Sequence, residues 1–383
     1  MWKHIAANAL TLLIAAMILL AGAVAMGQRA FVAAGPLEQA ICLRVEQGAN
    51  LRAVTASLDA QGAVSSPMLF RLAAQYDGRD SRLRFGSYLV PAGASMDQIL
   101  DIVTRGGAST CGTEIVLRVG ITEVSYQLRE LDPATNRFGD ALILPLETTE
   151  FPAEYQQAAS QPDTRFRIAV AEGATSWQIW NALTQAEFLA GTLPEVPVEG
   201  VLSPDSYEVR RGADRAGLVA EMEARQASIL ATAWAGRAEG LPFDTPEQAL
   251  ILASIVEKET GVAEERRVVA SVFINRLRAP MRLQTDPTVI YGITRGQGTL
   301  GRGLRRSELA ANTPYNTYRI DGLPPTPIAN PGRASIEAVL NPEASNYLYF
   351  VADGTGGHVF SSTLAEHNAN VARWRRIEAE QDN

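Results

Sequence analysis

Two glutamates in one apolar run are of the residue type that acid–base chemistry requires. Glu257 and Glu259 lie in the apolar run Ala249–Thr260, which has the periodicity of an amphipathic helix. On such a helix Glu259 ends an apolar stripe, whereas Glu257 points to the opposite side. Glu259 would also lie in the last turn, where burial and the helix dipole both raise the pKa of a carboxyl group. A carboxyl group that stays protonated near neutral pH is what a general acid requires. The stripe consists of Ile251, Leu252, Ile255 and Val256.

Glu259 also has a purely structural interpretation. A glutamate at a helix end can bend into solvent or pair with a nearby cation, and Arg266 and Arg267 follow closely in the sequence. Most glutamates at such positions are solvated. The periodicity alone therefore leaves a catalytic and a structural role open.

The helix that would position Glu259 has its own start and stop signals. Thr245 and Gln248 have the spacing of a capping box, and Pro246 is preset for the first helical position. Gly261 suits the position just after the helix. We therefore predict a capped helix that ends close to Glu259.

The N-terminal segment determines the compartment of the remaining residues. Ile5–Met26 is a mostly apolar run, and ~20 apolar helical residues suffice to cross a membrane. Its length and flanks favour a membrane anchor over residues 1–28, with Lys3 in a short cytoplasmic tail. A cleaved signal peptide is the alternative, because Ala23–Ala25 resembles a cleavage site. Both interpretations export the rest of the chain.

An exported chain can contain a disulfide bond. Cys42 and Cys111 are the two cysteines of the sequence, and they fit no metal-ligand spacing. The sequence does not give the distance between them, so a disulfide and two unpaired thiols both stay open.

A short pattern, a valine followed three positions later by Gly-Ala, occurs three times. The copies begin at Val45, Val90 and Val170, and each indicates a strand end, a glycine turn and a helix start. Residues 35–110 are therefore expected to form a small α+β module. Residues 128–165 are rich in proline and have little periodicity, which favours a linker or an elaborated loop region. The expected N-caps of the three helices are Asn50, Ser95 and Thr175.

Composition excludes several classes of protein. The net charge of −8 argues against a general nucleic-acid-binding protein, which needs a basic surface. Lys258 is the only lysine after Lys3, and no glycine-rich run precedes it, which excludes a Walker A loop. His358 and His367 are the only histidines after His4, too few for a His-rich metal site. We therefore expect neither a cofactor nor a metal ion.

The segment Gly296–Gly301 matches the pattern GxGxxG. A dinucleotide site needs a strand before this pattern and a helix after it. The segment lies instead in a stretch rich in glycine and arginine, so we do not interpret it as a nucleotide site.

A long collinear series of motifs runs from about residue 199 to residue 372. Together these motifs resemble the MltG (YceG-like) family of endolytic murein transglycosylases. The matching segments are Ala253–Thr260, Val269–Leu277, Met281–Gly292, Thr313–Tyr318, Gly322–Pro325, Ile328–Gly332, Tyr347–Gly354 and Gly356–Phe360.

The resemblance implies an α+β chain. Its parts would be an N-terminal transmembrane helix, a LysM-like module at 35–110 and a mixed α/β catalytic domain at 166–383 that contains the capped helix. Residues 111–165 would be a linker or an inserted region, to which nothing is carried over. The chain would cross the inner membrane once, with its catalytic domain in the periplasm.

The resemblance also implies a reaction. Glu259 matches the catalytic glutamate of the family, which leaves Glu257 as a structural control. The expected reaction cleaves the β-1,4 bond between N-acetylmuramic acid (MurNAc) and N-acetylglucosamine (GlcNAc) within glycan strands. The C6 hydroxyl of the sugar closes a 1,6-anhydro ring, so the second carboxylate that ordinary glycosidases use is not required.

Residues of the matching motifs are the candidates for substrate binding. Each has a structural alternative: an aspartate before proline can cap a helix, tyrosines pack in cores, and a histidine after two glycines can bond within its turn. The candidates are Gln284, Asp286, Thr288, Tyr291, Tyr315, Asn316, Tyr318 and His358.

Two other functions stay open at this point. A non-catalytic peptidoglycan-binding scaffold would use the repeated strand–turn–helix modules. A hydrolytic muramidase would use Asp286 or Asp205 to activate water and would leave reducing ends. The resemblance further implies peptidoglycan synthases of the elongation or division machinery as partners.

Overall fold

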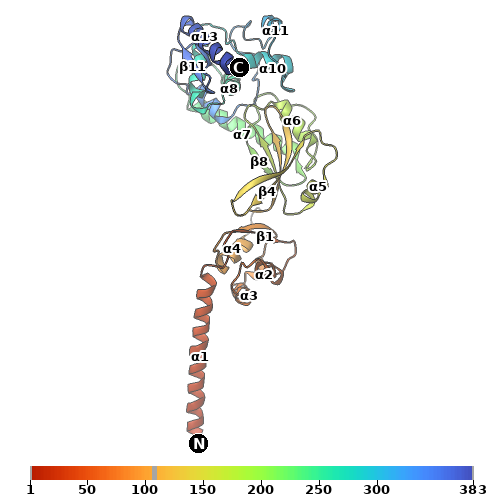
Figure 1. Cartoon of the computed structure of the whole chain (residues 1–383), viewed down its shortest axis with the longest axis vertical. Helices are drawn as coiled ribbons and strands as arrows, with labels where there is room; N and C mark the ends of the chain where they lie inside the picture. The colour runs from red at the N-terminus through yellow and green to blue at the C-terminus, as the bar shows by residue number, and fades with distance from the viewer. Residues whose placement is uncertain (1, 106–109, 382–383) are drawn as a thin grey trace. The chain divides into compact units, whose positions relative to one another are not determined.

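The computed structural model describes residues 2–105 and 110–381 and has the mixed helix and sheet content that the sequence predicts (Figure 1). Met1, part of the predicted cytoplasmic tail, lies outside the described residues, as do the side chains of Lys3 and His4. The chain divides into two compact units. Unit 1 contains Met1–Ile115, Gln127–Ile143 and Thr149–Arg165, and unit 2 contains Val116–Tyr126, Leu144–Thr148 and Phe166–Asn383.

The N-terminal apolar run forms one continuous helix, α1 (Trp2–Val32) (Figure 1). Its segment Leu10–Val32 is long and apolar enough to cross a membrane, and none of its most apolar stretch is buried within the protein. Near the end of α1, the side chain of Phe31 packs in the hydrophobic core of unit 1. The helix is therefore longer than the predicted run Ile5–Met26, because its last turn packs against protein.

Unit 1 contains a small two-stranded sheet covered by helices. The strands β1 (Ile41–Val45) and β2 (Gly86–Val90) pair antiparallel, with Leu43 opposite Tyr88. Two helices, α2 (Leu51–Ala60) and α3 (Pro67–Tyr76), lie between these strands in the sequence. The short helix η1 (Asp80–Arg82) and the helix α4 (Met96–Arg105) complete this part.

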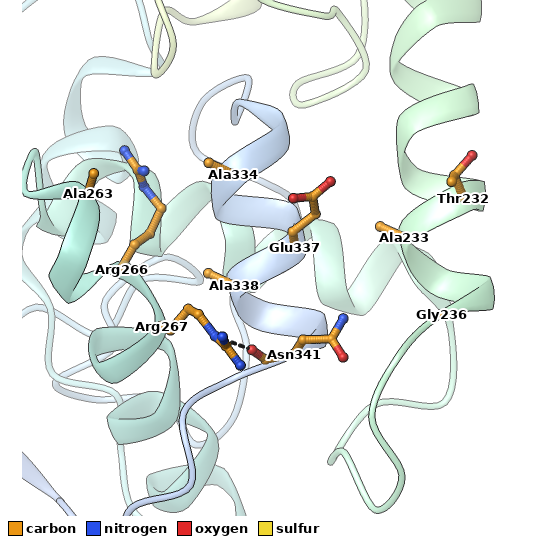
Figure 2. A pocket seen from close by; sticks show the side chains of 10 residues that line it. All are labelled: Thr232, Ala233, Gly236, Ala263, Arg266, Arg267, Ala334, Glu337, Ala338 and Asn341. Atoms are coloured by element: carbon orange, nitrogen blue, oxygen red, sulfur yellow. Dashed lines mark hydrogen bonds between the residues drawn. The ribbon is translucent and has the colours of Figure 1, made fainter.

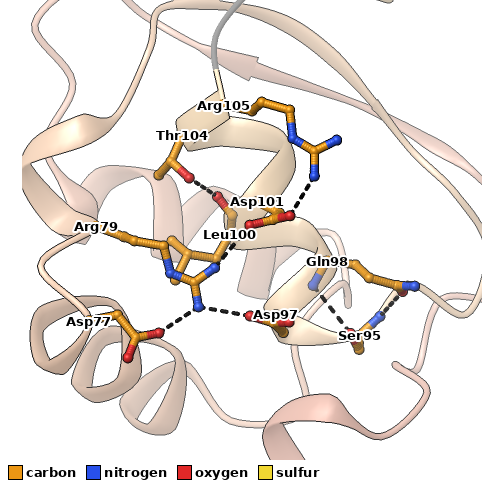
Figure 3. Close-up of polar contacts among 9 residues, drawn as sticks. All are labelled: Asp77, Arg79, Ser95, Asp97, Gln98, Leu100, Asp101, Thr104 and Arg105. Atoms are coloured by element: carbon orange, nitrogen blue, oxygen red, sulfur yellow. Dashed lines mark hydrogen bonds and ion pairs between the residues drawn. The ribbon is translucent and has the colours of Figure 1, made fainter.

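A cluster of charges joins two of these helices (Figure 3). Arg79, just after α3, donates hydrogen bonds to Asp97 at 2.7 Å and to Asp101 at 3.1 Å, both on α4. It also bonds Asp77 at 2.6 Å. One guanidinium group thus fixes the end of α3 to the side of α4 through several carboxylates.

Unit 1 also contains the disulfide that the sequence left open. Cys42, in β1, is bonded to Cys111, with their Cα atoms 5.7 Å apart. Both cysteines of the chain are therefore paired.

The proline-rich region is not an unstructured linker. Residues 111–165 include the strands β3 (Thr113–Val119), β4 (Val124–Asp132) and β5 (Arg137–Pro145) and the helix α5 (Ala153–Ser160). The prolines misled the prediction because they lie where elements begin or end: Pro145 is the last residue of β5, for example. Residues 111–165 thus contain regular secondary structure, and their assignment as a linker or an inserted region stays a prediction.

One sheet contains five strands in the order β5-β4-β3-β6-β8. Strand β6 (Arg165–Val170) pairs antiparallel with β8 (Ser206–Val209), which places Ile168 opposite Tyr207. Both side chains are buried. A smaller parallel pair consists of β7 (Leu189–Ala190) and β9 (Ala213–Asp214).

The threefold sequence pattern has the predicted structure in every copy. A strand (β1, β2 or β6) ends at the valine, a glycine takes the left-handed conformation, and a helix (α2, α4 or α6, Ser176–Gln185) begins. The glycines Gly48, Gly93 and Gly173 have φ of 80°, 68° and 79°, which only glycine adopts without strain. The predicted caps are confirmed, since each accepts a backbone hydrogen bond: Asn50, Ser95 and Thr175.

The rest of unit 2 is largely helical. The helices α8 (Pro246–Glu259), α9 (Arg266–Arg278) and α12 (Arg333–Leu340) supply most of one hydrophobic core, to which the end of α7 (Arg215–Ala235) adds Ile229. The remaining elements are η2 (Ala263–Glu265), α10 (Asp286–Thr294), α11 (Arg306–Ala310), β10 (Tyr349–Ala352), β11 (His358–Ser361) and α13 (Leu364–Gln381).

Helix α8 is buried on more sides than a simple apolar stripe predicts. Leu252 and Ile255 of the stripe are fully buried, but so is Ala253 on the opposite side, because α7, α9, α10 and α12 all contact this helix. Thr245 caps the first turn as predicted, whereas the side chain of Gln248 accepts its bond from the backbone of the preceding Asp244. As a result, the end of α8, which carries Glu259, is surrounded by other parts of the protein.

Candidate active site

A pocket of about 520 Å³ in unit 2 contains the side chain of Glu259. The pocket is formed by the end of α8, by α9, by the loop that leads into α10, by β10 and by the start of α13. Its lining residues are Glu259, Phe273, Arg276, Leu283, Gln284, Thr285, Asp286, Pro287, Tyr318, Tyr349, Phe350, Leu364, His367 and Asn368.

Glu259 has the electrostatic surroundings of a proton donor. Burial raises the pKa of its carboxyl group, and the nearby charge of Asp286 raises it further. A hydrogen bond from the hydroxyl of Thr285, with the positive charges of His358 and Arg276, lowers the pKa in part. The net direction is upward, as the sequence predicts. Among the described residues no ion pair joins Glu259 to an arginine; Arg267, one predicted partner, donates instead to the carbonyl of Asn341 at 2.8 Å.

Thr285 is held by a buried network of threonines. Its backbone N–H donates to Oγ1 of Thr317 at 3.0 Å, and Oγ1 of Thr288 donates to its carbonyl at 2.8 Å. Thr288 and Thr317 also bond each other at 2.8 Å, and all three side chains are almost fully buried. Thr288, predicted as a substrate contact, therefore supports Thr285 from behind and does not line the pocket.

The loop before α10 contributes an unusual backbone conformation. Gln284 lines the pocket and has φ of 47°. This left-handed conformation is energetically unfavourable for any residue other than glycine. Its N–H donates to the carbonyl of Thr317 at 3.1 Å. This geometry turns the chain so that Thr285 and Asp286 reach the pocket.

Asp286 and Tyr318 form the second polar pair of the pocket. The hydroxyl of Tyr318 donates to Oδ1 of Asp286 at 2.7 Å. Burial and the charge of Asp286 raise the pKa of Tyr318, so the phenol stays neutral and remains a donor. The predicted N-cap role of Asp286 is wrong: the N-cap of α10 is Thr285, and Asp286 is the first helical residue. There its charge interacts favourably with the helix dipole.

Arg276 was not predicted from the sequence, yet it forms one wall of the pocket. Its guanidinium group donates to the carbonyls of Leu348 at 2.7 Å and Leu283 at 2.6 Å and lies 5.5 Å from the ring centre of Tyr349. Burial lowers the pKa of Arg276, but an arginine side chain stays positively charged at neutral pH. It supplies a fixed positive charge close to Glu259.

Helix α13 brings a histidine that the sequence did not single out. The ring of His367 stacks on Tyr349 with centroids 5.1 Å apart and lines the pocket. Its Nδ1 atom is buried and has no hydrogen-bond partner among the described residues. Burial and the nearby Arg276 lower its pKa, which favours the neutral imidazole. A neutral ring can offer its other nitrogen to a bound molecule.

Three candidates belong to the surrounding core and not to this pocket. The hydroxyl of Tyr291 donates to Glu199 at 3.1 Å, and that of Tyr315 bonds Thr326 at 2.8 Å. Asn316 is fully buried and holds a turn by donating to the carbonyls of three residues. Those residues are Glu308, Leu309 and Ala311.

His358 lies beside the pocket and does not line it. Its Nδ1 atom is 2.7 Å from Oε2 of Glu265, and its backbone N–H donates to the same carboxylate at 2.8 Å. Its ring packs edge-on against Phe350, which does line the pocket. His358 therefore reaches Glu259 only through a long-range electrostatic interaction, which lowers the pKa of Glu259.

The other glutamate of α8 faces elsewhere. Oε2 of Glu257 accepts a hydrogen bond from the backbone of Gly332 at 2.9 Å, and Glu257 is not among the residues that line the pocket. Asp205, the other residue considered for water activation, pairs with Arg225 at 2.5 Å and is also outside this pocket. Glu259 and Asp286 are thus the carboxylates that meet there.

A separate pocket of about 490 Å³ lies among α7, α9 and α12 (Figure 2). Its lining includes Arg266, Arg267 and Glu337, but Glu337 is engaged by Arg333 at 3.7 Å. The side chain of Glu337 is 53% exposed, so this pocket does not enclose it. In the described parts of the chain, no cluster of three or more histidine, cysteine or acidic side chains is arranged to hold a metal ion.

Comparisons with known proteins show which family and which chains this protein resembles. The model of the YceG-like family matches residues 43–373. A protein of Bacillus subtilis named endolytic murein transglycosylase is 27% identical over 85% of this chain and 82% of its own length. A protein of the same name from Streptococcus pneumoniae is 27% identical over 87% of this chain, which spans 58% of that relative. The solved structure of a yceG-like protein from Listeria monocytogenes is 23% identical, covering 87% of this chain and 99% of that one, with a TM-score of 0.47.

Proposed function

The chain belongs to the YceG-like family, and from this we propose that it is an endolytic murein transglycosylase. It would be a lyase that cleaves the MurNAc–GlcNAc β-1,4 bond within peptidoglycan strands and so limits the length of nascent strands. The observation that carries the proposal is the half-buried Glu259 at the end of α8, which lines a pocket together with Thr285 and Asp286.

In the first step Glu259 acts as the general acid. Its raised pKa favours the protonated form of the carboxyl group, which transfers its proton to the glycosidic oxygen. The C1–O bond breaks and the leaving sugar departs with that proton. The positive charge that develops at C1 is stabilised by the carboxylate of Asp286, which Tyr318 holds in place.

In the second step the Glu259 carboxylate acts as the base. It accepts the proton of the C6 hydroxyl of MurNAc, whose oxygen attacks C1 and closes the 1,6-anhydro ring. Glu259 ends the cycle protonated, as it began. One carboxyl group therefore serves both steps, and no water is consumed.

We also propose roles for the other parts of the chain. Residues 1–28 would form a single-pass anchor in the inner membrane, supported by the apolar helix α1. Residues 35–110 would be a LysM-like peptidoglycan-binding module, supported by the two helices between paired strands. Residues 166–383 would be the catalytic domain, in the periplasm. The Cys42–Cys111 disulfide supports an oxidising compartment for the module. Peptidoglycan synthases would be the partners.

Mass spectrometry of the products tests the proposal. The full chain is incubated with uncrosslinked glycan strands, beside Glu259→Gln and the matched control Glu257→Gln. We expect internal fragments that end in 1,6-anhydro sugars, formed at least about 100-fold more slowly by Glu259→Gln and normally by the control. Reducing ends would support a muramidase that uses Asp286 instead. Strand binding without products from any variant would support the scaffold.

A further inference from the structure

We propose that a second pocket beside Glu259 binds further sugar units of the same glycan strand. This pocket has a volume of about 360 Å³ and lies entirely in unit 2. Its key residues are Lys258, Thr175 and the glycine-rich loop 296–301. The inference rests on the proposed function, because it assigns a subsite to the same reaction.

The two pockets adjoin each other. Pro287 lines both of them, so its ring forms part of the wall on either side. Lys258 lines the second pocket, and the next residue, Glu259, lines the first. A strand that is cut internally must extend past the catalytic acid in both directions. We assign one such extension to the second pocket, because the two pockets share Pro287 and have adjacent residues of α8 in their linings.

Lys258 supplies hydrogen-bond donors to the second pocket. Its ammonium group makes one long hydrogen bond, to the carbonyl of Gly173 at 3.4 Å. An ammonium group has three donors, so donors remain for a bound molecule. Burial lowers the pKa of Lys258, while Glu257 and Glu199 raise it. A desolvated cation of this kind gains from oxygen atoms such as sugar hydroxyls and the acetamido carbonyl.

The glycine-rich loop 296–301 forms another part of the lining. Oγ1 of Thr175, the N-cap of α6, donates to the carbonyl of Gly296 at 2.6 Å and so fixes the start of the loop. Gly296, Gly298 and Gly301 all line the pocket, where the lack of side chains lets a ligand approach the backbone. Helix α10, and not a strand, precedes the GxGxxG segment, so the segment lacks the context of a nucleotide site. Lining this pocket gives the segment a different role.

The remaining lining suits a sugar better than a uniformly polar or apolar ligand. The lining contains both apolar side chains and threonine hydroxyls, and a sugar ring has apolar faces with hydroxyl groups at its edge. Such sites combine apolar surface with a few placed polar groups. The apolar members are Ile121, Ile290, Leu300 and Ile328, and the hydroxyls come from Thr294 and Thr299.

The test uses a ladder of uncrosslinked glycan strands that lengthen by one disaccharide at a time. For the wild-type full chain, KM should fall as the strands become long enough to enter the second pocket. Lys258→Met keeps the length of the side chain and removes its donors. We expect KM for long strands to rise about tenfold, with kcat and the KM of the shortest substrate almost unchanged.

Two further variants separate occlusion of the pocket from damage to the fold. A side chain at Gly298 would meet no atom within 4 Å and would project from the loop that lines the pocket, so Gly298→Leu should also raise KM for long strands only. Gly303 is equally open but does not line the pocket, so Gly303→Leu is the matched control and should behave as wild type.

The outcomes distinguish the subsite from the proposed function. If the wild type makes 1,6-anhydro products and both Lys258→Met and Gly298→Leu keep its dependence on strand length, the subsite is refuted and the function stands. Absence of such products from the wild type would refute the function itself. An unchanged thermal unfolding temperature for Lys258→Met shows that the fold is intact.

Discussion

The hydroxyl of Thr285 donates a hydrogen bond to the carboxylate of Glu259, and Thr317 in turn binds the backbone of Thr285. The group that lowers the pKa of Glu259 is therefore itself fixed by the buried core. Burial still determines the net direction of the shift. The balance between these opposing effects gives a carboxyl group that can both release and accept a proton.

Thr285→Val should change the pH profile of the reaction. The substitution keeps the shape of the side chain but removes the donor that stabilises the Glu259 carboxylate, so the pKa of Glu259 rises. A general acid works below its pKa, and the alkaline limb of the kcat profile therefore moves to higher pH. We expect kcat at its optimum to fall about tenfold, because the carboxyl group loses its fixed orientation. Thr285→Ser should restore both properties, and an unshifted limb in Thr285→Val would contradict the assignment.

Glu259→Gln should unfold at a higher temperature than the wild type at neutral pH. The folded protein raises the pKa of Glu259, so ionisation of this group is less favourable in the folded state than in the unfolded state. The contribution of Glu259 to stability is therefore lost as the pH rises from the ordinary pKa of a glutamate through the raised pKa in the folded protein. Glutamine does not ionise, so the Glu259→Gln variant avoids this loss of stability. Thermal unfolding measured at several pH values should show a difference that disappears below the ordinary pKa; equal curves at all pH values would argue against the shift.

Asp286 and Tyr318 should behave as one unit. The phenol donates to the carboxylate at 2.7 Å, and a hydrogen bond to a charged group contributes about 1.5–3 kcal/mol. In a double-mutant cycle of Asp286→Asn and Tyr318→Phe, measured by kcat/KM, the second substitution should therefore add little to the first. Strictly additive effects would mean that the two side chains act independently.

Removal of the disulfide should destabilise the chain without changing its reaction. Cys42 and Cys111 are 69 positions apart, and a closed loop of this size corresponds to about 4 kcal/mol in the chain-entropy description. The double variant Cys42→Ala, Cys111→Ala should have a lower unfolding temperature, whereas both bonded cysteines lie outside the residues that line the Glu259 pocket. Calorimetry and product analysis check the two parts separately, and a large loss of kcat would contradict the second.

The sequence predicted best what depends on neighbouring residues. The position of Glu259 at the end of a largely apolar helix followed from helical periodicity, and the left-handed turns at Gly48, Gly93 and Gly173 followed from a local pattern. These features are determined within a few residues of chain. The pairing of Cys42 with Cys111 needed the fold, because distance in space does not follow from spacing in the sequence.

The polar residues of the site were harder to sort. Gln284, Asp286 and Tyr318 line the pocket, whereas Thr288 and Asn316 are buried and serve the backbone of the same loops. Sequence alone does not distinguish a polar side chain that faces a ligand from one that satisfies a buried carbonyl.

Residues brought by distant elements escaped prediction. Arg276 lies on α9 and His367 on α13, and each reaches Glu259's pocket only because its helix packs there. In the sequence each resembles an ordinary charged or polar residue on a helix surface. Signals existed for one of them: Arg276 belongs to the matching segment Val269–Leu277, although no role could be read from that position alone.

The end of α1 has a mechanical consequence. Phe31 lies in the core of unit 1, and within a few residues the N–H of Gly35 donates to Gly93 while Leu37 accepts from it. The apolar helix thus joins the first folded module without slack. If α1 spans a membrane, as we propose, a tether of this kind fixes the height of the module above the lipid surface. Its reach could be extended only by inserting residues after Phe31, not by any change within the module.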